Sequence, residues 1–150
     1  MDNLYMFIAT GGGSGYLPKA PGTWGSVVGV LFWFFFHRLA LSRYGLLVAG
    51  LFILGTIAAG AAEKIMDRPD PGPVVVDEIV GQMIALAGAP ANPIIVILGF
   101  IFFRFFDILK PLPVGWLDSH IHGGMGIMLD DVAAGVYAIL LLQLGLWLFT

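Results

Sequence analysis

Long apolar segments separated by short polar ones are the dominant feature of this sequence. Residues Tyr44–Ala62 contain no charged side chain, and Gln143 is the one strongly polar residue in Val132–Phe149. A helix that crosses a bilayer needs about 20 predominantly apolar residues. Both segments come close to this length, so the chain is expected to fold as a helical membrane protein.

Three further segments have the same character. Residues Ser26–Leu41 and Pro93–Lys110 are strongly apolar over most of their length. Residues Ile79–Ala89 are short for a full crossing and are expected to tilt, to thin the bilayer or to lie inside the bundle. A turn at Pro90–Pro93 separates Ile79–Ala89 from the apolar segment that follows it. The sequence therefore predicts an all-α, polytopic membrane bundle of four to five hydrophobic helices with Gly/Pro-rich cytoplasmic loops, formed by residues 1–150 as one domain.

The composition excludes several classes of function. Charged residues make up 11% of the chain, against about 25% in ordinary soluble domains. The net charge of −3 provides no basic surface for nucleic acid. The absence of cysteine excludes disulfides, thiolate metal sites and cysteine nucleophiles. The N-terminal residues lack the basic region and long apolar core of a signal peptide, so internal segments are expected to direct insertion.

Alternating membrane crossings sort the loops, and the charges with them, onto two faces. All ten acidic residues and five of the seven basic residues fall on one face, and only Arg38 and Arg43 fall on the other. Because Lys and Arg in short loops favour the cytoplasmic side, the charged face is expected to be cytoplasmic. The same alternation predicts a cytoplasmic N-terminus and an external C-terminus.

Two acidic pairs on this face are candidates for chemistry. Asp77 and Glu78 stand at one predicted helix start, and Asp130 and Asp131 stand at another. The positive end of a helix dipole favours anions at such positions. A purely structural interpretation, in which these acids follow this preference and anchor the membrane interface, therefore stays open.

Three charged residues near the end of one apolar segment form a second pattern. Arg104, Asp107 and Lys110 follow one another at intervals of three, so they share a helix face. They could form an intrahelical ion pair that ends the helix. Alternatively, Asp107 binds a metal while Arg104 or Lys110 meets an anion.

The residue types on the charged face are those of a magnesium site. Mg²⁺ binds carboxylate oxygens, several waters and substrate phosphates. Two acidic pairs without a metal would repel each other, whereas a shared ion would turn them into ligands. The sequence therefore predicts one acidic cluster, with Mg²⁺ as cofactor and a phosphate as the anion that the basic residues meet. The predicted ligands are Asp77, Glu78, Asp107, Asp130 and Asp131.

The glycine-rich segment before the first apolar helix is a candidate phosphate-binding loop. The stretch GGGSGYLPKAPGTWGS lacks the Gly-Lys-Ser/Thr of a P-loop. Its glycines, with Lys19, Thr23 and Ser26 ahead of a helix, nevertheless suit an anion cradle. A flexible loop without ligand is the alternative. Further along the chain, His120 and His122 flank Ile121, and a single catalytic histidine among them is a candidate acid for a leaving group.

Four motifs in this order and spacing resemble the bacterial phosphatidylglycerophosphatase A family: KAPGTWGS, VVVDEIVGQ, FFRFFDILKPLPVGWLD and HGGMGIMLDDVAAG. The resemblance implies a Mg²⁺-dependent phosphatase of the bacterial inner membrane, with its active site on the cytoplasmic face. Such enzymes remove the terminal phosphate of phosphatidylglycerophosphate to give phosphatidylglycerol. The resemblance extends to Lys19, Pro21, Gly22, Thr23, Gly25, Ser26, Asp77, Glu78, Gly81, Arg104, Asp107, Lys110, Pro111, Asp118, His122, Gly123, Gly124, Asp130 and Asp131.

Several points stay open on the sequence alone. Attack by a metal-activated water is favoured, and an aspartyl-phosphate intermediate is the alternative. A small channel or transporter with an acidic metal-binding face is the rival function. Ionisable residues gather at one interface, however, and none lies in the middle of a predicted helix within the Ser26–Ala62 or Asp131–Phe149 spans. Membrane lipids are expected partners, and a homo-oligomer is compatible with the sequence.

Overall fold

The protein is built from helices alone, as the sequence predicts. The computed structural model describes all of residues 1–150. It contains seven α-helices and one 3₁₀ turn: α1 (Asp2–Ala9), η1 (Ser14–Tyr16), α2 (Pro21–Phe36), α3 (Leu41–Met66), α4 (Val76–Ala85), α5 (Pro93–Leu109), α6 (Val114–His120) and α7 (Gly123–Phe149).

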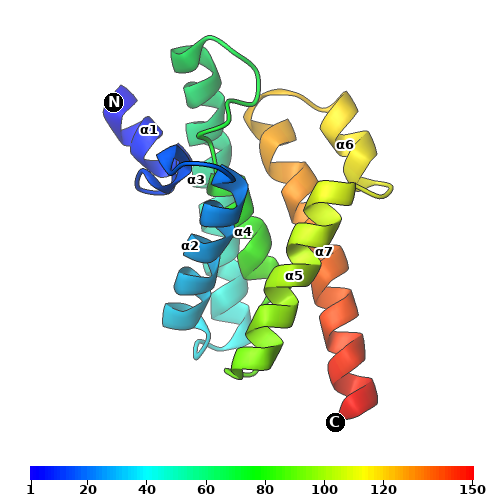
Figure 1. Cartoon of the computed structure of the whole chain (residues 1–150). Helices are drawn as coiled ribbons and strands as arrows, with labels where there is room; N and C mark the ends of the chain where they lie inside the picture. The colour runs from blue at the N-terminus through cyan, green and yellow to red at the C-terminus, as the bar shows by residue number, and fades with distance from the viewer.

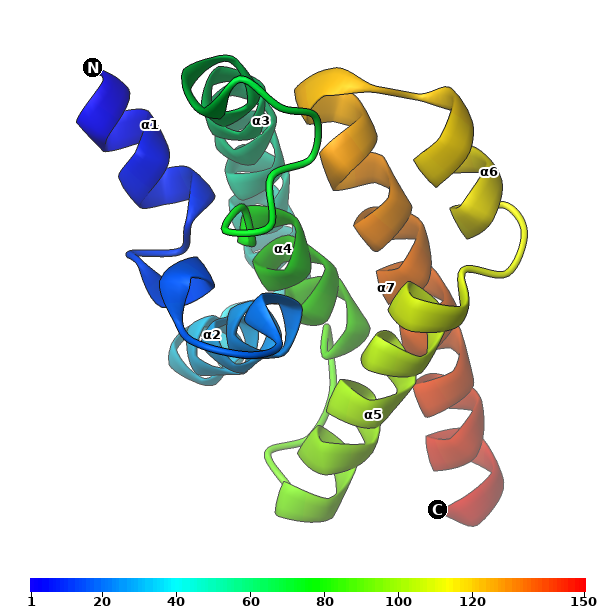
Figure 2. The same ribbon diagram turned by 45° about the horizontal axis from the view of Figure 1, so that its top comes forward.

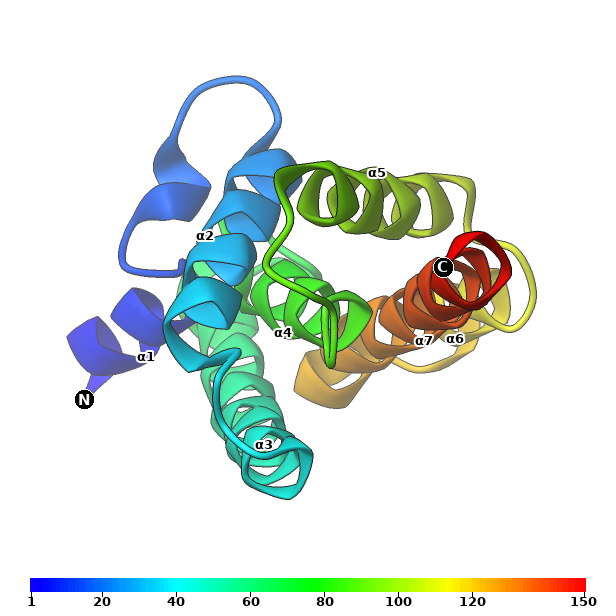
Figure 3. The same ribbon diagram turned by 90° about the horizontal axis from the view of Figure 1, so that it is seen from below.

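The short helix α4 lies at the centre of the bundle. Helices α2, α3, α5 and α7 surround it (Figures 1 and 3). Its residues Val76, Asp77, Ile79, Val80, Gly81, Gln82, Met83 and Ala85 are all buried. Of the two acids in its first turn, Asp77 is therefore held inside protein and Glu78 is half-buried.

The connecting segments gather at the two ends of the bundle. The segments between α1 and α2, between α3 and α4, and between α5 and α7 lie at the upper end in Figure 1, and α6 lies there too. The α2–α3 and α4–α5 turns and the C-terminus lie at the lower end (Figure 1). Figure 2 shows the α3–α4 segment passing over the end of α4.

The distribution of side chains is inverted relative to a water-soluble protein. Many large apolar side chains are exposed, among them Phe35 (76%), Leu46 (74%) and Trp147 (77%), while four aspartates are buried. Helices α3 and α7 have 26 and 27 residues, and each contains an 18-residue stretch with a mean hydropathy of 2.1. Both are long and apolar enough to cross a membrane. Helices α2 and α5 have 16 and 17 residues. An apolar exterior of this kind is matched by lipid tails.

The predicted start of the last helix is wrong. Helix α7 begins at Gly123, eight residues before Asp131, so the acidic pair lies in the third helical turn. The glycines that argue against a helix here permit close packing. A Cβ on Gly124 would collide with the Thr56 carbonyl on α3, and one on Gly126 would collide with the Ile121 carbonyl. Asp131 therefore cannot serve as a helix cap.

Other boundaries differ from the prediction by a few residues. Helix α2 starts five residues early because Pro21 can take the first helical position, and it ends before Leu41. Helix α3 continues past Ala62 to Met66, and α4 ends before Ala89. Helices α1 and α6 are not predicted, because both are short and the sequence around them is rich in glycine and proline.

Candidate active site

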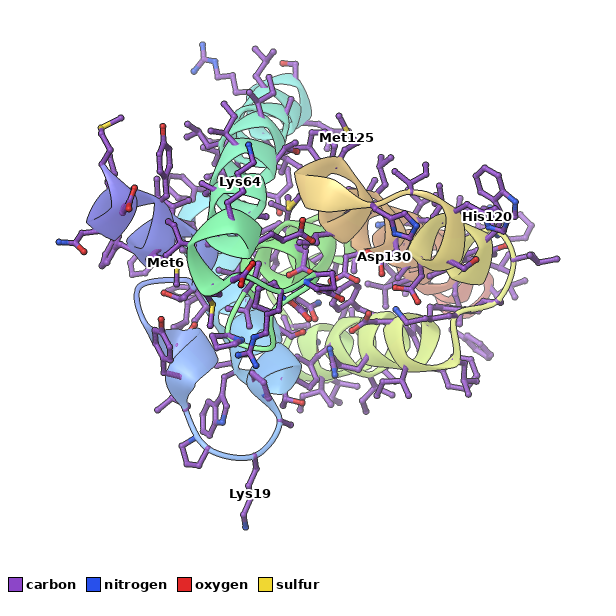
Figure 4. All side chains as sticks on the ribbon, turned by 90° about the horizontal axis from the view of Figure 1, so that it is seen from above. Met6, Lys19, Lys64, His120, Met125 and Asp130 are labelled. Atoms are coloured by element: carbon purple, nitrogen blue, oxygen red, sulfur yellow. The ribbon has the colours of Figure 1, made fainter.

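Five carboxylates from three helices meet beside α4. Ligand oxygens of Asp77, Asp130 and Asp131 lie within 4.8 Å of one another. Oxygens of Glu78, Asp107 and Asp131 form a second such group. The structure thus brings together the acidic residues that the sequence places on one face. Figure 4 shows Asp130 near the centre of the bundle, viewed from the end that carries the loops.

Close helix packing makes this meeting of carboxylates feasible. A Cβ on Gly81 of α4 would lie 2.7 Å from the Asp131 carbonyl oxygen of α7. A Cβ on Gly29 of α2 would lie 2.9 Å from the Ile79 carbonyl oxygen of α4. Because glycine occupies both positions, α2 and α7 approach α4 at backbone distance. The first turn of α4 can therefore share a site with residues of its neighbours.

The carboxylates are buried and incompletely paired. Asp131 is 1% exposed, and Asp77, Asp107 and Asp130 are also buried. One oxygen each of Asp77, Glu78 and Asp131 is buried without a hydrogen-bond partner. Burying unpaired carboxylates close together costs free energy unless a cation compensates their charge. The cluster could therefore hold a metal ion, and its all-oxygen donor set suits a hard cation.

Two basic side chains border the cluster. Arg104 forms an ion pair with Asp107, and a Cβ on Gly22 would lie 2.9 Å from Arg104 Nη1. Lys110 Nζ lies 3.2 Å from Asp130 Oδ2, 3.7 Å from Asp118 Oδ1 and 3.9 Å from Asp107 Oδ1. Arg104 thus faces the start of α2, and Lys110 links α5, α6 and α7.

Lys110 keeps its positive charge in this setting. Burial lowers the pKa of its ammonium group, but the carboxylates of Asp130, Asp107 and Asp118 raise it by more. The net pKa of Lys110 lies above its usual value. The border of the cluster therefore carries a charged ammonium group on Lys110 beside the guanidinium group of Arg104.

The predicted phosphate-binding loop is only partly at the cluster. The Ser26 hydroxyl is buried and donates a hydrogen bond to the Gly22 carbonyl at 3.0 Å. Thr23 is half-buried in the first turn of α2. Lys19 is exposed in a left-handed backbone conformation (φ 70°), and Figure 4 shows it extending away from the cluster. The start of α2 adjoins the carboxylates, whereas the Lys19 ammonium group does not.

Asp130 also lines a small polar cavity. The cavity has a volume of about 120 Å³, and its lining includes Glu63, Asp70, Asp118 and His122. The Asp70 backbone N–H donates a hydrogen bond to Glu63 Oε1 at 2.9 Å. Glu63 and Asp70 are not among the residues that the sequence predicts. The sequence signal for them is the acidic stretch that lies between the apolar segments Tyr44–Ala62 and Ile79–Ala89. His122, an exposed residue at the start of α7, belongs to this cavity.

These features define a class of protein: a helical bundle with membrane-length helices, a buried carboxylate cluster and cationic side chains at its border. Within this class, the sequence model of the phosphatidylglycerophosphatase A (PgpA) family matches residues 7–146. The chain belongs to this family. The match includes every residue of the cluster and its border.

Curated relatives are similar over most of their length. Phosphatidylglycerophosphatase A of Escherichia coli K12 is 40% identical over 137 residues, which cover 91% of this chain and 80% of that protein. The Haemophilus influenzae protein of the same name is 40% identical over 140 residues, or 92% and 86% of the two chains. A Bacteroides thetaiotaomicron protein, provisionally named a phosphatidylinositol-3-phosphatase, is 40% identical over 151 residues, or 96% and 94%. No solved structure gives a significant match.

Proposed function

We propose that this protein is a phosphatidylglycerophosphatase that hydrolyses the terminal phosphate monoester of phosphatidylglycerophosphate to phosphatidylglycerol and phosphate. The observation that carries the proposal is the family match over residues 7–146, which covers the whole carboxylate cluster. Two relatives bear this activity in their names. A phosphate monoester on a lipid suits a site where carboxylates and cations meet at one end of an apolar bundle.

The cofactor is proposed to be Mg²⁺. Its ligands would be drawn from Asp77, Glu78, Asp107, Asp130 and Asp131, and the unpaired buried oxygens of three of these residues support this assignment. When bound, Mg²⁺ supplies positive charge and Lewis acidity beside the phosphate. Phosphate binding and proton transfer are carried out by the side chains and backbone of this chain.

Arg104 and the start of α2 are proposed to bind the phosphate. The guanidinium group presents paired N–H donors that match phosphate oxygens. Helix α2 has no side-chain cap at its first turn. The Thr23 and Trp24 N–H groups donate to the Ala20 carbonyl, and the Gly22 N–H is left to bind an anion. Thr23 adds a hydroxyl. We assign Ser26 a supporting role, because its hydroxyl already donates to the Gly22 carbonyl.

Lys110 and His122 are proposed to stabilise negative charge: Lys110 on the phosphate and His122 on the leaving group. Lys110 holds Asp130 in place through its 3.2 Å contact and offers positive charge to the phosphate. His122 can donate a proton to the leaving alkoxide. Attack by water, with one of the carboxylates as base, and attack by a carboxylate to give an aspartyl phosphate are both compatible with this arrangement.

We place the protein in the bacterial inner membrane as a multi-pass chain, with the cluster on the cytoplasmic side. The two membrane-length helices and the apolar exterior support this placement. A reporter enzyme fused after Thr150 is expected to read as periplasmic. A cytoplasmic signal from this fusion would reject the proposed topology.

Hydrolysis of purified lipid tests the proposed function. The protein in detergent micelles is expected to release phosphate from phosphatidylglycerophosphate with Mg²⁺, and to release none after treatment with EDTA until Mg²⁺ is restored. Phosphatidylinositol 3-phosphate serves as the second substrate because one relative carries that name. Faster turnover of the inositol lipid would reassign the substrate. Cation flux into vesicles without any phosphate release would favour the channel alternative.

Replacing Arg104 is expected to cost far more activity than replacing Lys19. Arg104→Met removes a donor beside the cluster, and the loss of such a contact commonly lowers turnover about 10²–10³-fold. Lys19→Met removes an exposed charge that points away from the cluster, so less than a tenfold change in kcat/KM is expected. Steady-state kinetics at saturating Mg²⁺ provide the comparison. A larger loss in Lys19→Met would mean that its loop folds over the substrate.

A further inference from the structure

We infer that Trp33 and Gln82 form a hydrogen-bonded chain that ends on Glu78 and orients its carboxylate. The first observation concerns Gln82, which is 0% exposed at the centre of the bundle. Neither its Oε1 nor its Nε2 has a hydrogen-bond partner. A primary amide that is buried without partners is rare, because its desolvation is not compensated. We therefore expect the Gln82 amide to have one hydrogen-bond donor and one acceptor as partners nearby.

The other unpaired buried groups supply one donor and one acceptor of the required kinds. Trp33 Nε1, which can only donate, has no partner, and neither has Glu78 Oε2, which accepts when ionised. Gln82 offers one acceptor and one donor group. The other unpaired oxygens are on Asp77 and Asp131. All three acids belong to the groups that could hold the cation, but only Glu78 lies one helical turn before Gln82 on α4.

The positions of these residues put the amide between the two partners. Gln82 follows Glu78 by four residues in α4, so the two side chains share a face of the helix. On the α2 side, a Cβ on Gly29 would lie 2.7 Å from Gln82 Cβ. Trp33 follows Gly29 by four residues and packs in one cluster with Ile79 and Met83, the neighbours of Gln82 on α4.

Chemistry fixes the direction of the chain. The Trp33 indole N–H must donate to Gln82 Oε1, and the Gln82 amide must donate to Glu78 Oε2, because the reverse order would pair donor with donor. Because the terminal torsion of Gln82 has broad minima, we expect its amide to rotate until both bonds form. Glu78 Oε1 is left facing Gly22 and Arg104. Gln82 is thus a positioning residue that touches neither substrate nor metal.

The consequence for cation binding rests on the proposed function, whereas the chain of bonds does not. Residues that orient a metal ligand typically contribute about 10–100-fold to metal affinity. Loss of the amide should therefore weaken binding of a divalent cation without removing any ligand. The same loss should also alter the environment of the Trp33 indole.

Spectroscopy of the purified protein in micelles tests both consequences. Protein labelled with ¹⁵N-tryptophan has four indole N–H signals, and Trp33→Phe identifies one of them. Gln82→Met, which keeps the length and removes both hydrogen-bonding groups, is expected to move the Trp33 signal upfield. Mn²⁺ affinity, followed by electron paramagnetic resonance, is expected to fall about tenfold. Trp33→Phe is expected to weaken Mn²⁺ binding to a smaller extent.

The chain offers matched controls at the far end of the bundle. Gln143 is exposed and donates a weak bond to the Ala87 carbonyl at 3.4 Å, and Trp147 is 77% exposed. Gln143→Met and Trp147→Phe should leave the Trp33 signal and the Mn²⁺ affinity at their wild-type values. A fall in melting temperature alone does not distinguish Gln82 from any other buried residue, so the indole signal and the cation affinity decide.

Each outcome supports or overturns the inference. An unmoved Trp33 signal in Gln82→Met, or unchanged Mn²⁺ affinity, would overturn it. If Gln82→Met does not fold, the wild-type protein decides, because a Trp33 indole at the chemical shift of a free N–H contradicts the chain of bonds. If wild type binds Mn²⁺ and shows the expected indole signal but hydrolyses no lipid, the proposed function fails and the bonded chain stands.

Discussion

Asp131→Asn is expected to lower phosphatase activity about 10²–10³-fold while leaving the helices intact. Asp131 belongs to both groups of carboxylates that could hold a cation. It is 1% exposed, and its Oδ2 has no partner. Asparagine keeps the size of the side chain but removes one anionic ligand, so Mg²⁺ binding and charge stabilisation should weaken. Because Asp131 lies in the third turn of α7, loss of a helix cap cannot explain the effect.

Activity and stability measured together separate this effect from misfolding. Raised Mg²⁺ should partly restore turnover. In EDTA the variant should unfold at or above the wild-type temperature, because one of several mutually repelling buried charges is gone. Asp2→Asn, at an exposed position in α1, is the control and should behave as wild type. Near-normal turnover of Asp131→Asn at limiting Mg²⁺ would remove this residue from the site.

Gly81→Ala is expected to abolish most activity without touching any ionisable group. The added Cβ would lie 2.5 Å from Phe103 Cε1 and 2.7 Å from the Asp131 carbonyl oxygen. Helix α4 must then move away from α5 and α7, which carry the other proposed ligands. Overpacking of this kind costs about 1–3 kcal/mol, and a displacement of about 1 Å can cost about 10²-fold in rate.

A second glycine provides the control for this variant. A Cβ on Gly45 of α3 would meet nothing within 4 Å, so Gly45→Ala should retain wild-type kcat and gain slightly in thermal stability from the better helix former. Kinetics and thermal unfolding in the same detergent give the comparison. Full activity in Gly81→Ala would mean that α4 and α7 need not approach at backbone distance for catalysis.

Much of the carboxylate cluster could be predicted because it depends on chain direction and spacing. Alternating apolar segments place Asp77, Asp107 and Asp131 at the same end of the bundle, whatever the packing details. The rule that acids favour helix starts correctly locates Asp77 and Glu78 in the first turn of α4. It fails for Asp131, because Gly124 and Gly126 serve close packing within the helix, which already begins at Gly123.

Other features depend on tertiary contacts that no local pattern reports. The short helix α1 is fixed by long-range contacts, among them the hydrogen bond from the Val75 N–H to the Ala9 carbonyl at 2.8 Å. The sequence could not tell that the Ser26 hydroxyl bonds to its own helix. Nor could it tell that Lys19 turns outward, since a left-handed conformation in a glycine-rich loop leaves little trace in residue types.

The enclosure of α4 has a consequence for how the protein is made. With ten residues, α4 is too short to cross the bilayer alone, where about 20 are needed, and its first turn carries two acids. During synthesis, α2 and α3 emerge before it, but α5 and α7 emerge after it. Until α5 and α7 are made, they cannot shield Asp77 and Glu78 from lipid. We therefore expect the α4 segment to stay at the membrane surface until then. The cluster can be completed only when the last helix is released. A nascent chain that stops before Gly123 carries three of the five proposed ligands and lacks Asp130 and Asp131.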